Sequence, residues 1–263
     1  MPIGILKKTW EQENELWLSD PPTKKDHVRS MIILLWTALG LAIVEYWGNP
    51  EFVASVLINW NCKDAAHAFS AYMHQGSDAR LHNLCWWSGT IIFVYFVVPS
   101  FLTIFVFKMK LSDMGLRLKG SLQGWPLYVI MLGVMIPLVW YFSSTASFQS
   151  RYPFYRMAEG ENFWPNFIIW EVVYLVQFAS LEFFFRGFIT LGTRKSFGFM
   201  SIFVMMVPYC MIHFGKPMPE TIGAIVAGVV LGTLSMKSRS VLLGIMIHYS
   251  VAITMDLFAL WHR

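Results

Sequence analysis

The chain has 263 residues, of which 56% are hydrophobic and 14% are charged, with a net charge of +4 and a mean hydropathy of +0.51. Soluble domains carry about 25% charged residues, so this composition excludes an ordinary soluble globular protein. The apolar residues fall in long uncharged runs, which predicts an all-α, polytopic transmembrane helix bundle. The small net charge gives no reason to expect nucleic acid as a partner.

We expect residues 1–30, which are charged and contain prolines, to form a solvated cytoplasmic tail, and residues 31–263 to form a single membrane domain. Uncharged or nearly uncharged runs predict seven spans, at 31–47, 86–107, 124–142, 163–191, 196–213, 221–236 and 240–261.

The segment 51–74 is harder to assign. Its apolar part is too short to cross a bilayer, and the rest carries Lys63, Asp64, His67 and His74. We therefore interpret it as an interfacial or re-entrant segment. A true span there, which would give eight, is the alternative.

Two patterns concern how the spans are oriented and packed. With the N-terminus inside, the inner segments carry thirteen Lys and Arg residues and the outer segments six, which favours a cytoplasmic N-terminus. In the span at 221–236, Ala224, Gly228 and Gly232 recur at every fourth position. Such spacing predicts a face along which another helix approaches closely.

Ionisable side chains inside the apolar spans point to function, because each costs roughly 2.5–3.5 kcal/mol to place in a bilayer. Glu182 and Arg186 lie four residues apart in one span, and His213, His248 and Asp256 lie in later ones. From the helical rise per residue we expect Glu182, Arg186 and His248 near mid-membrane, with His213 and Asp256 nearer the outer surface. The alternative for Glu182 and Arg186 is a purely architectural ion pair.

These residue types permit a limited chemistry. A carboxylate and an imidazole can deprotonate a water for attack on a carbonyl, and a second imidazole can stabilise the oxyanion. Glu182, His213 and His248 could equally ligate zinc, so metal-bound and metal-free water both remain open. The sequence holds no G-x-S-x-G and no H-E-x-x-H motif.

From about residue 172 to residue 257 the chain resembles the CPBP family of intramembrane proteases, which includes the CAAX prenyl endopeptidases and bacterial relatives linked to bacteriocin self-immunity. The resemblance rests on three motifs, which are Glu182-Phe183-Phe184-Phe185-Arg186-Gly187, Tyr209-Cys210-Met211-Ile212-His213, and His248-Tyr249-Ser250-Val251-Ala252. The family pattern has a further glutamate where this chain has Leu181, and Asn or Asp where it has Ala252.

The resemblance implies a glutamate-dependent endopeptidase whose catalytic-type core is 162–261. Its partners would be the lipid bilayer and a membrane-anchored peptide or protein substrate, and its location a bacterial cytoplasmic membrane. Glu182 and His213 would activate water, and His248 would stabilise the oxyanion. Arg186 would orient Glu182, while Glu220 or Asp256 would assist.

Two other functions stay open beside the peptidase. One is a non-catalytic membrane scaffold or binding protein on the same fold. The other, a proton-coupled transporter, is weaker because the sequence has no inverted repeat of broken helices.

Overall fold

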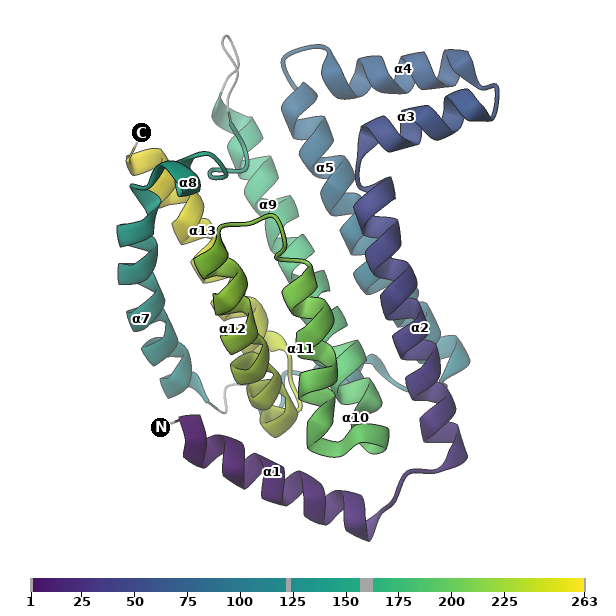
Figure 1. The fold of residues 1–263 in the computed structure, drawn as a ribbon, viewed down its shortest axis with the longest axis vertical. Helices are drawn as coiled ribbons and strands as arrows, with labels where there is room; N and C mark the ends of the chain where they lie inside the picture. The colour runs from purple at the N-terminus through teal and green to yellow at the C-terminus, as the bar shows by residue number, and fades with distance from the viewer. Residues whose placement is uncertain (1, 122–123, 157–162, 263) are drawn as a thin grey trace.

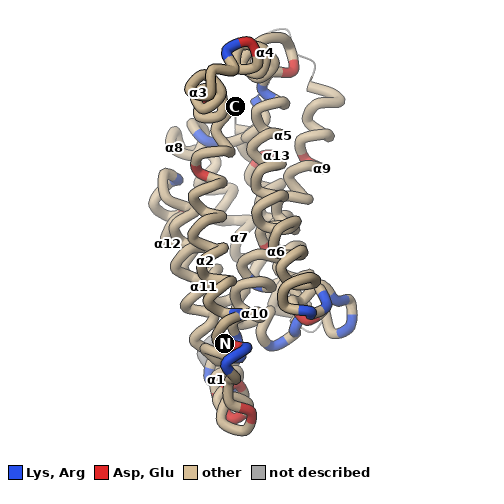
Figure 2. Tube along the Cα trace, turned by 90° about the vertical axis from the view of Figure 1, so that its right-hand side faces the viewer, with Lys and Arg blue, Asp and Glu red and all other residues tan. Residues whose placement is uncertain are grey.

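The computed structural model describes residues 2–121, 124–156 and 163–262, and all regular structure within them is helical (Figure 1). Six helical stretches are long and apolar enough to cross a membrane, which makes the chain an integral membrane protein. They are Lys24–Trp47, Ala79–Val106, Trp125–Ser143, Phe163–Met211, Met218–Ser238 and Leu242–Trp261. Figure 2 shows charged residues gathered at the two ends of the bundle, with few between them.

The 49-residue stretch Phe163–Met211 accounts for two of the seven predicted spans. Helix α9 (Phe163–Glu182) continues through the π-helix η4 (Phe183–Leu191) into α10 (Gly192–Phe197). The chain then turns at Gly198, whose φ is 54°, and returns as α11 (Ser201–Met211) (Figure 1). The predicted helical bundle is therefore confirmed, and its span count agrees approximately.

The segment 51–74 does not supply an eighth span. It forms two short helices, α3 (Pro50–Asn59) and α4 (Lys63–His74), which pack against each other at one end of the long helices and project to the side of the bundle (Figure 1). At ten and twelve residues, neither helix is long enough to cross the apolar layer. Their position agrees with the interfacial interpretation.

The N-terminal region, for which the sequence predicts a solvated tail, is helical. Helix α1 (Pro2–Ser19) packs across the opposite end of the bundle, and α2 (Lys24–Trp47) begins seven residues before the predicted span (Figure 1). A capping box between Thr23 and Asp26 fixes the start of α2. Helix α1 is held because Glu13, only 5% exposed, forms ion pairs with Arg194 and Arg239.

The remaining helices surround α9 and η4. Helix α9 packs against α5 (Ala79–Ile92) and α13 (Leu242–Trp261), while η4 packs against α11 and α12 (Met218–Ser238). Helix α7 (Trp125–Ser143) packs mainly on α13. All nine residues of η4 are buried, so the charged side chain of Arg186 lies in the protein interior rather than in lipid.

The shorter elements connect these helices. The chain after α5 continues through η1 (Phe93–Val97), α6 (Val98–Phe101) and η2 (Leu102–Val106). Single turns follow at η3 (Leu111–Met114), α8 (Ala146–Gln149) and η5 (Gly198–Met200).

The predicted small-residue face of α12 is confirmed. A Cβ added at Gly228 would lie 3.1 Å from Cγ of Met206, and one at Gly232 would lie 3.0 Å from Cγ2 of Ile202. Both neighbours belong to α11. The glycines therefore allow α11 and α12 to pack closely, which brings the end of α11 beside the start of α12.

Candidate active site

The three ionisable groups at the centre of the bundle form one cluster. Glu182 is the last residue of α9, Arg186 lies in η4, and both side chains are fully buried. Oε1 of Glu182 lies 2.8 Å from Nδ1 of His248 and 3.0 Å from Nη1 of Arg186. The carboxylate thus joins the helix that carries Arg186 to α13, which carries His248.

The π-helical turns of η4 begin at the residue after Glu182. A π-helix adds one residue to the turn and rotates the side chains that follow, and such turns are frequent at functional sites. Here the wider helical turn occurs where the Glu182 carboxylate and the Arg186 guanidinium lie together inside an aromatic core. Phe183, Phe184 and Phe185 are fully buried around them.

The contact with Glu182 assigns the proton on His248. An ionised carboxylate can only accept, so Nδ1–H of His248 donates the hydrogen bond and the neutral ring leaves Nε2 as an acceptor. The side chain of His248 is 18% exposed, while that of Glu182 is fully buried. Any group in the adjoining cavity therefore meets the imidazole rather than the carboxylate.

Arg186 is held by an aromatic face as well as by the carboxylate. Its guanidinium carbon lies 3.9 Å from the centre of the Tyr209 ring, a cation–π arrangement. Among the described residues, none of its three side-chain nitrogens meets an acceptor with hydrogen-bond geometry, so the 3.0 Å approach to Glu182 is an ion-pair contact. The guanidinium therefore places a positive charge directly beside the buried carboxylate of Glu182.

His213 lies just beyond the end of α11 and is 7% exposed. Its Nδ1 is 2.8 Å from the carbonyl oxygen of Tyr209. A carbonyl oxygen only accepts, so Nδ1 carries the proton and Nε2 is left as an acceptor. Burial, with the nearby charge of Lys216, lowers the pKa of His213 to about 3. His213 is therefore a neutral imidazole near pH 7.

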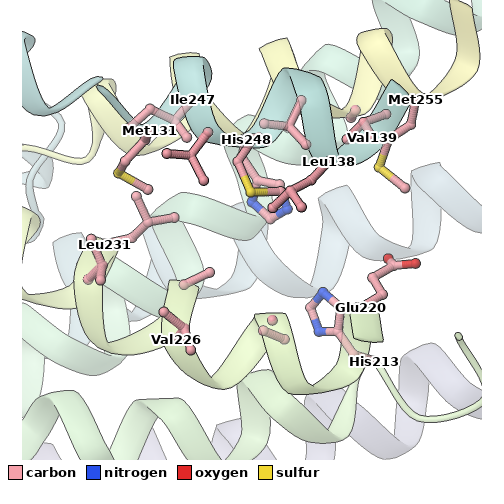
Figure 3. Close-up of a pocket in the computed structure, with 18 of the residues that line it drawn as sticks. Met131, Leu138, Val139, His213, Glu220, Val226, Leu231, Ile247, His248 and Met255 are labelled. Atoms are coloured by element: carbon pink, nitrogen blue, oxygen red, sulfur yellow. The ribbon is translucent and has the colours of Figure 1, made fainter. Parts of the chain in front are cut away.

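Both imidazoles line one cavity of about 680 Å³. Figure 3 shows His248 and His213 projecting toward it from α13 and from the end of α11. Most of the wall is apolar and comes from α7, α12 and α13, for example Met131, Val226 and Ile247 (Figure 3). The cavity suits an apolar ligand, with the two imidazoles placed where polar chemistry can occur.

Glu220 also faces this cavity, near His213 (Figure 3). It lies in the first turn of α12, where a negative charge is favoured by the helix dipole. Each of its carboxylate oxygens accepts from the Tyr152 hydroxyl at 3.0 Å, and Oε1 also accepts from Nζ of Lys216 at 2.6 Å. Glu220 thus ties the loop after α8 to the start of α12.

Asp256 lies apart from the cluster. It is fully buried, and its Oδ1 and Oδ2 accept from the backbone N–H of Phe154 at 3.3 Å and from Nε1 of Trp170 at 3.5 Å. Neither partner is an ionisable group of the candidate site. The contacts give Asp256 a role in holding the loop that contains Phe154.

The two positions that depart from the family pattern have apolar surroundings. Leu181 is 7% exposed and belongs to the aromatic core around η4. Ala252, one turn after His248, lines the cavity. Glu182 is therefore the carboxylate that contacts an imidazole of the site. Position 252 carries no side-chain amide, because its residue is alanine.

The donor set does not fit a zinc ion. Within 2–121, 124–156 and 163–262, no three His, Cys, Asp or Glu side chains are grouped as metal ligands. Oε1 of Glu182 is already bonded to His248 and paired with Arg186, whose charge would repel a cation. Glu182, His213 and His248 are therefore not assigned as zinc ligands.

Sequence reasoning assigned no role of their own to two residues of this site. The ring of Tyr209 contacts Arg186, and its carbonyl fixes the tautomer of His213. Tyr152 binds Glu220 across 68 residues of chain. For Tyr209, the four-residue spacing to His213 was a usable signal, because such residues face each other on a helix. Nothing in the local sequence indicated Tyr152.

Residues 162–254 match the family model described as type II CAAX prenyl endopeptidase Rce1-like. The match contains all three motifs and confirms the resemblance to CPBP-type intramembrane proteases for about a third of the chain. No curated protein and no solved structure matches the chain.

Proposed function

We propose that this protein is an intramembrane endopeptidase that hydrolyses a peptide bond in a membrane-associated substrate. The observation that carries the proposal is the 2.8 Å bond between buried Glu182 and His248, whose imidazole opens on a cavity shared with His213. A carboxylate that orients an imidazole beside a substrate cavity is a recurring arrangement for general base catalysis. The family match, which names an endopeptidase, supports it.

The proposed reaction uses a water held in the cavity. Nε2 of His248 accepts one proton from the water as its oxygen attacks the scissile carbonyl carbon. The resulting imidazolium is stabilised by Glu182, to which its Nδ1–H already donates. When the tetrahedral intermediate collapses, the C–N bond breaks and Nε2–H returns the proton to the leaving amine.

His213 has a different part in this scheme. Because it is neutral and presents Nε2 as an acceptor, it orients the water through the second hydrogen. The family resemblance instead implies that Glu182 contacts the water and that His248 stabilises the oxyanion. The burial of Glu182 behind His248 favours the new division, in which His248 is the base and Glu182 its positioning partner.

The cavity supports a substrate that resides in the bilayer. Its walls are mostly apolar and are contributed by α7 and α12, which belong to membrane-crossing stretches. A soluble peptide would lose hydration on binding there without replacing its hydrogen bonds. We further propose that the end carrying α1 faces the cytoplasm, as the distribution of Lys and Arg favours.

The test is cleavage of membrane-anchored reporter peptides in proteoliposomes. His248→Gln should lower kcat by roughly 10²–10⁴-fold, the usual contribution of a general base. Glu182→Gln should also lower kcat, because it removes the negative charge that stabilises the imidazolium. Glu51→Gln, at an exposed carboxylate of α3, is the matched control and should retain the wild-type rate. If Glu182→Gln cleaved the reporters at the wild-type rate, Glu182 would have no part in the reaction.

Metal dependence is tested on the same preparation. The proposed reaction requires no metal ion, so strong chelators should leave the rate within about twofold of the untreated enzyme, because the base is an imidazole. Loss of activity in chelator, with recovery on adding zinc, would show that the water is metal-bound and would contradict this scheme.

A second candidate is a non-catalytic membrane binding protein on the same fold. It is favoured by Leu181 and Ala252, which stand where the family pattern has a carboxylate and an amide-type residue. This candidate predicts that reporters bind equally to the wild type and Glu182→Gln and that neither cleaves them. Comparing protein termini between membranes with the wild type and with Glu182→Gln would separate the two functions.

A further inference from the structure

Gly244 lies one helical turn before His248 on α13, on the side that faces Glu182. A Cβ placed on it would come closer than 3.0 Å to Oε2 of Glu182 and within 3.3 Å of its Cδ. Real Cβ atoms do not approach other atoms so closely, so any side chain here would displace the carboxylate. The absence of a side chain at 244 therefore makes the space that Glu182 occupies.

The two carboxylate oxygens meet two positions of the same helix. Oε1 receives Nδ1–H of His248, while Oε2 lies where the first carbon of a side chain at position 244 would be. Oε2 is buried and has no hydrogen-bond partner among the described residues. An unsatisfied buried oxygen is costly, so a further displacement of this carboxylate by a side chain at position 244 would add to a site that is already strained.

Other glycines of the helices make different contacts. Gly89 and Gly133 have no atom within 4 Å of an added Cβ, and Gly228 and Gly232 meet flexible apolar side chains. Among the glycines that the structure describes, Gly244 is the one whose added Cβ would meet a carboxylate. Glycine costs about 1 kcal/mol relative to alanine inside a helix, so its place here calls for a reason of this kind.

We infer that Gly244 is a positioning residue, which seats the Glu182 carboxylate so that Oε1 aligns with Nδ1 of His248. The catalytic role of Gly244 rests on the proposed function. The packing of Glu182 against position 244, by contrast, can be measured without a substrate. Gly244→Ala should push the carboxylate away from α13 and lengthen or break the 2.8 Å bond.

The decisive experiment is a double-mutant cycle on unfolding in detergent, with Gly244→Ala, Glu182→Ala and the double variant. Gly244→Ala should lower the unfolding midpoint when Glu182 is present. In the Glu182→Ala background the same change should be neutral or stabilising, because the clashing carboxylate is gone. Gly89→Ala is the control and should have the same small effect in both backgrounds.

Two further measurements report on the position of the Glu182 carboxylate. In histidine-labelled protein, NMR should detect a Nδ1–H of His248 that is protected from exchange in the wild type and in Gly89→Ala and is exposed to exchange in Gly244→Ala. If the protein cleaves reporters, Gly244→Ala should lower kcat by roughly 100-fold with little change in KM, since a shift of about 1 Å in a catalytic group has that effect.

The outcomes separate the two proposals. Equal effects of Gly244→Ala in both backgrounds, with the His248 proton still protected, would overturn the positioning role. A large coupling between positions 244 and 182 together with no cleavage of any reporter would support the seating and count against the endopeptidase.

Discussion

The guanidinium of Arg186 lies over the ring of Tyr209, with 3.9 Å between the guanidinium carbon and the ring centre. The same side chain is 3.0 Å from Oε1 of Glu182. Tyr209 in turn accepts Nδ1–H of His213 through its carbonyl oxygen at 2.8 Å. A contact between a cation and an aromatic face therefore connects the Glu182–His248 pair to the second imidazole.

Removing the Arg186 charge should destabilise the protein strongly. Arg186→Met leaves Glu182 as a buried, uncompensated carboxylate, and breaking a buried pair in this way costs about 3–5 kcal/mol. Chemical unfolding in detergent measures the loss. Arg186→Met combined with Glu182→Gln should be more stable than Arg186→Met alone, because no buried charge remains. A double variant at least as unstable as the sum of the single changes would show that the two side chains do not interact.

Stability should fall in acid because of His213. Burial and Lys216 lower the pKa of His213 to about 3, below its ordinary value of 6.5. Between these values the unfolded chain binds a proton that the folded protein does not, so stability is full above pH 6.5 and falls as the pH drops. The slope from one such group approaches about 1.4 kcal/mol per pH unit.

The measurement compares the wild type with His213→Gln between pH 7.5 and 4.5 in detergent. The variant lacks the titrating group, so its stability should decline less steeply than that of the wild type over this range. His27→Gln, at an exposed histidine of α2, serves as the control and should follow the wild-type curve. Parallel curves for the wild type and His213→Gln would contradict the lowered pKa.

Asp256 should matter for stability and little for chemistry. Asp256→Ala leaves the N–H groups of Phe154 and Trp170 without their acceptor, at a cost of roughly 1–3 kcal/mol for each. We expect a lower unfolding midpoint, with kcat per folded molecule within about threefold of the wild type, since Asp256 touches neither imidazole in the described structure. A loss of 100-fold or more in kcat would show instead that Asp256 assists the reaction, as the family resemblance implies.

Helix α1 should depend on Glu13 for its place against the bundle. The side chain of Glu13 is 6% exposed and pairs with both Arg194 and Arg239. In Glu13→Gln the helix should detach more often, so tryptic cleavage at Lys7 or Lys8 should be about tenfold faster, the effect of about 1.4 kcal/mol. Glu15→Gln, at an exposed position of the same helix, should be cleaved at the wild-type rate.

The sequence predicted most of the architecture for a simple physical reason. A helix that crosses lipid must satisfy its own backbone hydrogen bonds and be apolar along its length, so runs such as 124–142 identify spans without any knowledge of their neighbours. The same reasoning identified Glu182, Arg186 and His248, because ionisable groups are expensive in that setting. It did not place α1, whose docking depends on ion pairs between residues about 180 and 226 positions apart.

The tertiary structure decided which polar groups meet. Depth along a helix is readable from sequence, but the direction that a side chain faces depends on how helices rotate and pack. Glu182 and His248 were predicted at similar depth, and their packing makes them a hydrogen-bonded pair. Asp256, which lies two turns beyond His248 in sequence, is turned to Trp170 and Phe154 instead.

The sequence by itself thus determined that this protein is a membrane helix bundle with an ionisable centre in its C-terminal part. Only the tertiary structure decided that Glu182 is enclosed between Arg186, Gly244 and His248, and that the imidazole rather than the carboxylate faces the cavity. The physical reason is that hydropathy acts on each helix separately. Enclosure depends on contacts that exist only after α9, η4, α11 and α13 have packed together.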